Sequence, residues 1–129
     1  MKTIKQEIII HAKPHYVYEA ILSPAKHSKI TDAAATNTKK VGGKFTAYDG
    51  YIFGTNEELV PDKKIVQKWT TTDFPDNTFT EVTFEFKEEG MSKTKLIFTQ
   101  KNVPDDFYEE LVEGWQQFYW TPLQAFFEE

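Results

Sequence analysis

The sequence contains no cysteine and no arginine among its 129 residues. Without cysteine the chain has no disulfide, no thiolate nucleophile and no cysteine-ligated zinc. Without arginine it has no guanidinium group, the side chain that binds phosphate or guanine through two parallel hydrogen bonds. The net charge of -5 at pH 7 adds a general repulsion from polyanions. We therefore expect no nucleic-acid partner.

Long hydrophobic runs are also missing. The N-terminal segment MKTIKQEIIIHAKPH has an apolar run of only three residues, Ile8 to Ile10, with charged residues close on both sides. Such a segment is neither a signal peptide nor a membrane span. We therefore expect a cytoplasmic protein with no membrane span.

Motifs for metal binding and nucleophilic catalysis are absent as well. The histidines His11, His15 and His27 do not have the spacing of a metal motif such as H-E-x-x-H, and no Ser-His-Asp or Cys-His arrangement can be assembled. We predict no metal, no cofactor and no catalytic residue. These observations weigh against an enzyme, apart from one alternative at Glu57 that is described below.

The residues that are present predict a single α+β domain over residues 1–129. A composition of 40% hydrophobic and 27% charged residues is typical of a globular protein. Apolar periodicity predicts helices at 15–22 and 24–31, a long helix from residue 105, and strands at 3–12, 33–38, 44–48, 51–60, 63–72, 79–88 and 94–100. Short turns between the strands imply a curled antiparallel sheet of about six to seven strands around the long helix.

The final segment, Asp105 to Glu129, carries eight aromatic residues at helical periodicity, so the sheet must cover most of its circumference. Gly114 in its middle has two interpretations: it lets helix and sheet approach closely beside Trp115, or it keeps a cavity open above the helix. Pro122 is expected to bend or weaken the helix. Residues 102–129 hold seven acidic residues and no lysine, which predicts an acidic outward face.

Aromatic residues between sheet and helix form the candidate ligand-binding site. They predict either an apolar pocket with polar tyrosine and indole tips or a solid core that closes the cavity. Glu57 falls on the predicted inward face of strand 51–60, where a buried carboxylate would be a candidate functional group and a bulge would instead expose it. The candidate residues are Phe45, Tyr51, Phe53, Glu57, Trp69, Phe84, Phe98, Trp115, Phe118 and Tyr119.

Several short strings resemble those of a known family and follow its order along nearly the whole chain. They are Pro14-x-x-Val17-Tyr18-Glu19-Ala20-Ile21-Leu22-x-Pro24, Val41-Gly42-Gly43-Lys44-Phe45, Asp49-Gly50-Tyr51-Ile52-x-Gly54, Leu59-Val60-Pro61 with Ile65-Val66-Gln67-x-Trp69, Thr94-Lys95-Leu96, and Glu113-Gly114-Trp115. The ordered set resembles the START-like, Bet v 1-like (SRPBCC) superfamily and, within it, the C-terminal domain of the activator of Hsp90 ATPase.

This resemblance implies a helix-grip fold, with a cavity between the sheet and the long helix, but no single chemistry. In the activator a separate N-terminal domain precedes this one. Only Met1 and Lys2 precede the first predicted strand here, so we expect no such domain and no ATPase stimulation through it.

Three functions remain open. The first is a binder of a hydrophobic small molecule, acting as a monomer or weak homodimer. The alternative is a domain that associates with an Hsp90-type chaperone through the acidic helix face, with Glu109, Glu110 and Glu113 as its footprint. The second alternative is a cyclase- or hydrolase-like enzyme of the same fold that uses Glu57 as acid or base.

Overall fold

The computed structural model describes residues 1–128. Strand β1 (Lys2–Ile10) is followed by two short helices, α1 (Pro14–Leu22) and α2 (Pro24–Thr31). Six further strands follow in the described chain: β2 (Thr36–Asn37), β3 (Lys44–Ala47), β4 (Ile52–Val60), β5 (Lys64–Thr71), β6 (Thr80–Glu88) and β7 (Thr94–Val103). The C-terminal helix consists of η2 (Asp105–Phe107), α3 (Tyr108–Trp115), η3 (Gln116–Trp120) and α4 (Thr121–Phe126), and the short turn η1 (Tyr48–Gly50) joins β3 to β4.

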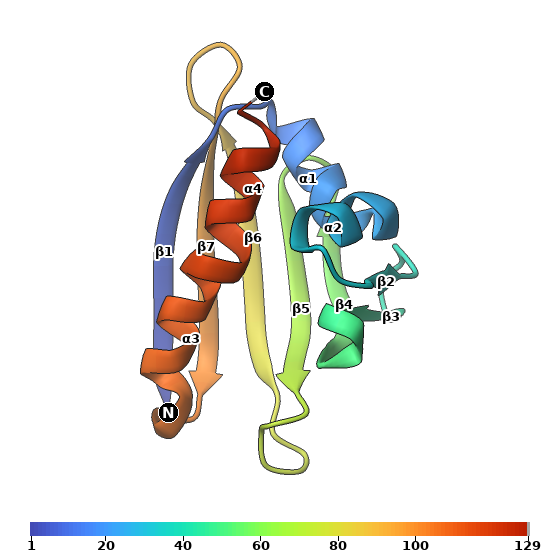
Figure 1. The fold of residues 1–129 in the computed structure, drawn as a ribbon, viewed down its shortest axis with the longest axis vertical. Helices are drawn as coiled ribbons and strands as arrows, with labels where there is room; N and C mark the ends of the chain where they lie inside the picture. The colour runs from blue at the N-terminus through green and yellow to red at the C-terminus, as the bar shows by residue number, and fades with distance from the viewer. Residues whose placement is uncertain (129) are drawn as a thin grey trace.

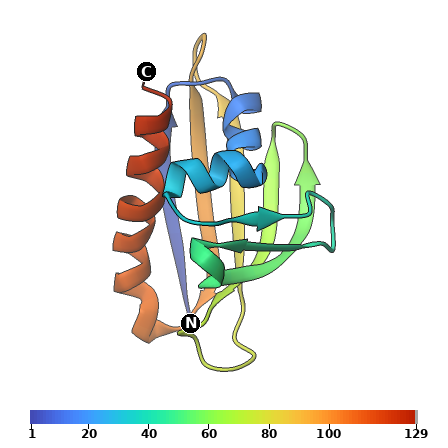
Figure 2. The same cartoon turned by 45° about the vertical axis from the view of Figure 1, so that its right-hand side comes forward.

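The strands form one antiparallel sheet in the order β1-β7-β6-β5-β4-β3-β2. The C-terminal helix crosses one face of this sheet, and α1 and α2 lie on the same side (Figures 1 and 2), where α2 packs against η3 and α4. The predicted α+β helix-grip fold is therefore confirmed. No helix within residues 1–128 combines the length and apolar character needed to cross a membrane.

Up to its bulge after Asn56, strand β4 presents the opposite face to the core from the one that the sequence pattern predicted. Ile52 and Asn56 are buried, whereas Tyr51 is 41% and Phe53 38% exposed. Gly54 shares the inward face with Ile52 and Asn56, and a Cβ there would collide with the backbone of Lys68 and press on the Phe45 ring, so only glycine fits. An apolar-periodicity argument fails here, since a glycine and an asparagine hold two of the inward positions.

Glu57 is exposed, so the predicted inward carboxylate is wrong. The pairing of β4 with β5 shifts register between Asn56 and Glu58, which leaves Glu57 as the extra residue of a β-bulge. Asn56 takes the buried position beside it, where its Oδ1 accepts a hydrogen bond from Gln67 Nε2 at 3.2 Å. The core therefore contains a neutral amide pair where a charge was expected.

The break expected at Pro122 takes the form of the π-helical turn η3, immediately before α4. Proline has no N–H to donate to the carbonyl four residues earlier, which belongs to Phe118. That carbonyl instead accepts a hydrogen bond from the Tyr48 hydroxyl at 2.7 Å. Pro122 thus disrupts the regular α-helical bonding and frees a backbone group that ties the helix to η1.

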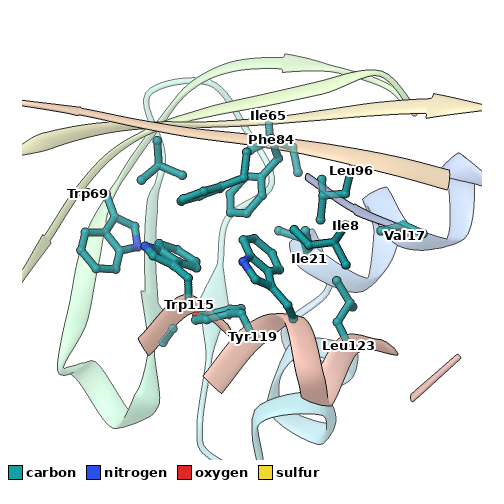
Figure 3. Packing of buried hydrophobic residues seen from close by; sticks show 14 of the residues in the cluster. Ile8, Val17, Ile21, Ile65, Trp69, Phe84, Leu96, Trp115, Tyr119 and Leu123 are labelled. Carbon is teal, nitrogen blue, oxygen red and sulfur yellow. The ribbon is translucent and has the colours of Figure 1, made fainter. Parts of the chain in front are cut away.

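Two indole–glutamine hydrogen bonds join the helix to the sheet inside the core. Trp115 Nε1 donates to Gln100 Oε1 at 2.7 Å, and Trp120 Nε1 donates to Gln6 Oε1 at 2.7 Å. Gln100 and Trp120 are fully buried, so water could not satisfy either of these two side chains if its hydrogen-bond partner were removed. These pairs fix the rotation of the helix about its axis, which directs Trp115 and Tyr119 toward the sheet (Figure 3).

Candidate functional site

A cavity of about 350 Å³ opens between the C-terminal helix and the β4–β5 side of the sheet. Its volume falls at the lower end of the range of roughly 300–1,000 Å³ found for small-molecule sites. Most of the wall is aromatic. The lining residues are Tyr48, Tyr51, Ile52, Trp69, Thr71, Phe74, Phe107, Glu110, Leu111, Gly114, Trp115, Phe118 and Tyr119.

The helix supplies one wall through residues spaced three and four apart. Phe107, Leu111, Gly114 and Phe118 repeat at this interval, so their side chains lie on one helical face. A Cβ built on Gly114 would meet only a ring carbon of Phe118, at 3.9 Å, and no atom of the sheet. The interpretation of Gly114 as a point of close helix–sheet approach is therefore wrong. The missing side chain instead leaves space in the cavity.

The inner wall is built from aromatic rings that pack against one another at tilted angles. Trp115 lies with its ring centroid 5.4 Å from that of Trp69 and 4.8 Å from that of Tyr119 (Figure 3). Its indole N–H is held by Gln100, which fixes the ring plane. On the outer side Phe74 and Phe107 pack with centroids 4.8 Å apart and connect the loop after β5 to the start of the helix.

Tyr119 is oriented by His27 of α2. His27 Nδ1 lies 3.0 Å from the Ile21 carbonyl oxygen, and Nε2 lies 3.0 Å from the Tyr119 hydroxyl. A carbonyl can only accept, so Nδ1 carries the proton and Nε2 accepts from Tyr119. Burial lowers the pKa of His27 and raises the pKa of Tyr119. The pair is therefore neutral at pH 7 and holds the tyrosine ring against the cavity.

The rim of the cavity is acidic. Glu110 is in the lining, and the Tyr51 hydroxyl donates to Asp73 Oδ2 at 2.8 Å. Burial, together with the hydrogen bond to Asp73 and the charges of Asp73 and Glu110, raises the pKa of Tyr51. No lysine is among the lining residues of the described chain, and no three histidine or carboxylate side chains within it gather in a metal-binding group.

Half of the candidate residues predicted from the sequence line this cavity: Tyr51, Trp69, Trp115, Phe118 and Tyr119. Phe45, Phe84 and Phe98 are buried in the core beside it. Phe53 and Glu57 lie on the exposed side of β4, away from the cavity. Pocket and solid core thus coexist, because Trp69, Trp115 and Tyr119 line the cavity and also belong to the buried hydrophobic cluster.

Other lining residues were not among the candidates. The spacing of Phe107 and Leu111 relative to the candidates Trp115 and Phe118 was a usable signal, since these residues share one helical face. Phe74 had no such signal, because it lies in an irregular loop where periodicity does not apply. Gln100, which positions Trp115, is marked in sequence only as a polar residue that follows Leu96 and Phe98 on the inward face of β7.

Comparison with known proteins gives consistent relatives. Residues 11–128 match the family described as activator of Hsp90 ATPase homolog 1-like protein. An activator of 90 kDa heat shock protein ATPase homolog from Dictyostelium discoideum is 31% identical over 116 residues, which cover 90% of this chain and 30% of that protein. The human activator homolog 1 is 29% identical over 125 residues, or 97% of this chain and 36% of that protein. The chain spans about a third of the length of these relatives.

Solved structures show the same fold. An HSP90 activator from Plasmodium falciparum superposes with a TM-score of 0.91 at 25% identity, covering 98% of this chain and 96% of that one. The Aha1 dimer from Colwellia psychrerythraea gives a TM-score of 0.83 at 21% identity, over 99% of this chain and 98% of that one. With its helix-grip fold and a match over residues 11–128, the chain belongs to the activator of Hsp90 ATPase homolog 1-like family.

Proposed function

We propose that this domain binds a hydrophobic small molecule in the cavity between the sheet and the C-terminal helix. The observation that carries this proposal is the 350 Å³ space itself, lined by aromatic rings inside a domain whose core is otherwise closely packed. Small-molecule sites are typically concave spaces of this kind, lined mainly by apolar and aromatic side chains. Gly114 strengthens the case, because a glycine in a helix costs roughly 1 kcal/mol relative to alanine and here leaves space at the cavity.

The polar groups of the inner wall are already hydrogen-bonded within the protein, which favours a ligand with an apolar body. The Tyr48 hydroxyl is engaged with the Phe118 carbonyl, and the Tyr119 hydroxyl with His27. The indole N–H of Trp115 is engaged with Gln100. Because these donors are already satisfied within the protein, a ligand gains most by burying apolar surface against the rings.

Binding of Nile red, an uncharged apolar dye, tests the proposal. We expect saturable fluorescence enhancement by the wild-type domain, and amide chemical-shift changes confined to the cavity lining. Gly114→Leu fills the space and should abolish the saturable component. Ala125→Leu is the matched control, because residue 125 lies on the exposed side of the same helix and outside the cavity. Absence of saturable binding, or equal binding by Gly114→Leu, would overturn the proposal.

A second candidate function is association with an Hsp90-type chaperone, which the family relationship favours. The relatives from Dictyostelium and human are activators of the 90 kDa heat shock protein ATPase, and the related Plasmodium structure is of an HSP90 activator. Glu109, Glu110 and Glu113 are exposed on α3 and are available to a basic surface.

Salt-sensitive binding to an Hsp90-type chaperone tests this second function. Because Glu110 also belongs to the cavity rim, the footprint is best probed with Glu109→Gln and Glu113→Gln together. Association that weakens in this double variant while Nile red binding is retained supports a surface role. Unchanged association would reject this footprint.

The enzymatic alternative is not proposed. It required Glu57 to face a cavity of substrate size, and this side chain is exposed at a bulge and outside the cavity lining. The expectation of a monomer or weak homodimer stays a prediction, which sedimentation equilibrium would decide.

A further inference from the structure

The charges around the cavity are of one sign. Glu110 of α3 lies in the lining, and Asp73, in the loop after β5 and outside the lining, accepts the hydrogen bond of the Tyr51 hydroxyl. Both carboxylates act electrostatically on Tyr51, so two separate elements place a negative charge near this lining ring. The lining residues of the described chain include no lysine, and the sequence has no arginine.

The positive groups near the start of the helix are engaged elsewhere. The N-terminal ammonium lies 3.1 Å from an Asp105 carboxylate oxygen. Lys2 Nζ lies over the ring of Tyr108, 4.8 Å from its centroid, and Tyr108 is not a lining residue. Neither group neutralises Glu110 or Asp73 through a contact. Among residues 1–128, neither Glu110 nor Asp73 has a salt-bridge partner, so no positive side chain offsets these carboxylates at contact distance.

Aromatic rings surround this negative rim. Tyr51 and Phe118 line the cavity while remaining 41% and 49% exposed, so their rings are accessible from the mouth. The face of an aromatic ring attracts a cation, and quaternary ammonium groups are recognised in sites of this composition. A carboxylate or sulfate group at the same place would meet two carboxylates and no base.

We infer that the cavity selects an amphiphilic organic cation, with its apolar body among the inner rings and an ammonium-type group between Glu110, Asp73 and the exposed rings. This inference rests on the proposed function, because it names the ligand class of the same cavity. The satisfied donors of the inner wall exclude a strongly polar body, and the acidic rim discriminates against fatty acids and other anionic amphiphiles.

Three probes with the same octyl chain separate head-group charge from apolar binding: octyltrimethylammonium chloride, octyl glucoside and octyl sulfate, each as monomers at low ionic strength. Binding is followed through the fluorescence of Trp69 and Trp115, which line the cavity, and checked by calorimetry. We expect the cation to bind about tenfold more tightly than the uncharged probe, and the anion to bind most weakly.

Glu110→Gln should reduce the ratio of octyltrimethylammonium affinity to octyl glucoside affinity several-fold. Glu109→Gln is the matched control, because it makes the same charge change on the same helix outside the lining. Both side chains are exposed, so neither substitution should disturb folding. Circular dichroism of the two variants verifies this.

The outcomes separate this inference from the function on which it rests. Equal affinity for the cation and the uncharged probe would overturn the inference and leave the proposed function standing. Failure of all three probes to bind would overturn both. An equal effect of Glu109→Gln and Glu110→Gln would show that net charge, and not the rim, sets the preference, which also overturns the inference.

Discussion

Replacing Gln100 by methionine is expected to destabilise the domain by about 2 kcal/mol. The Gln100 side chain is fully buried and accepts the Trp115 indole N–H at 2.7 Å. Methionine has a similar shape, so no large cavity forms, but the indole N–H loses its partner. An unsatisfied buried donor costs about 1–3 kcal/mol.

The other bond of Gln100 adds little to this cost. Its Nε2 donates to Thr80 Oγ1 at 3.0 Å, but the Thr80 hydroxyl keeps its own bond to the Trp69 carbonyl at 2.8 Å. The backbone pairing of Gln100 with Ile4 and Val82 is unaffected by the side chain. The expected loss is therefore dominated by the indole.

Urea unfolding measures the effect, with an unchanged m-value confirming that the denatured state is not altered. A double-mutant cycle with Trp115→Phe should give a coupling energy of about 1–2 kcal/mol, since removal of both partners leaves no orphaned donor. The exposed Gln117→Met is the control and should stay within about 0.5 kcal/mol of wild type. A Gln100→Met effect of that same small size, or additive single variants, would refute the assignment of this bond.

Three further predictions concern other parts of the site. Burial lowers the pKa of His27, so between its ordinary value of 6.5 and the lower pKa of the folded state the unfolded chain binds a proton that the folded chain does not. The free energy of unfolding should therefore decrease as the pH is lowered through this window, by at most about 1.4 kcal/mol per pH unit. Urea titrations of His27→Gln should lack this slope. Gly114→Ala should raise the free energy of unfolding by about 0.5–1 kcal/mol, because its Cβ would meet only Phe118 at 3.9 Å; a decrease would contradict this packing. Tyr48→Phe removes the hydroxyl bonded to the Phe118 carbonyl and should lower the free energy of unfolding by about 1 kcal/mol in urea titrations; an unchanged stability would contradict the importance of this bond.

The element order could be predicted from the sequence because it depends on interactions between near neighbours. Period-two alternation in Val82, Phe84 and Phe86 marks β6 through its own pleat, and the same side chains are buried in the structure. The aromatic periodicity after residue 105 likewise required a helix that the sheet must cover. Trp115, Phe118 and Tyr119 reached the cavity for this reason, because they lie on the helix that the pattern identified. Tyr51 lines the cavity from the turn before β4, although the inward face of that strand was predicted wrongly.

The tertiary structure decided the face of β4, the position of Glu57 and the size of the cavity. Lys68 and Phe45 leave no room for a side chain at Gly54, and a register shift against β5 exposes Glu57. Neither neighbour is adjacent in sequence. The pairing of Trp115 with Gln100 likewise joins two elements whose relative rotation no local pattern records. Periodicity states which side chains turn inward, whereas the space left between them depends on how far apart the packed elements stand.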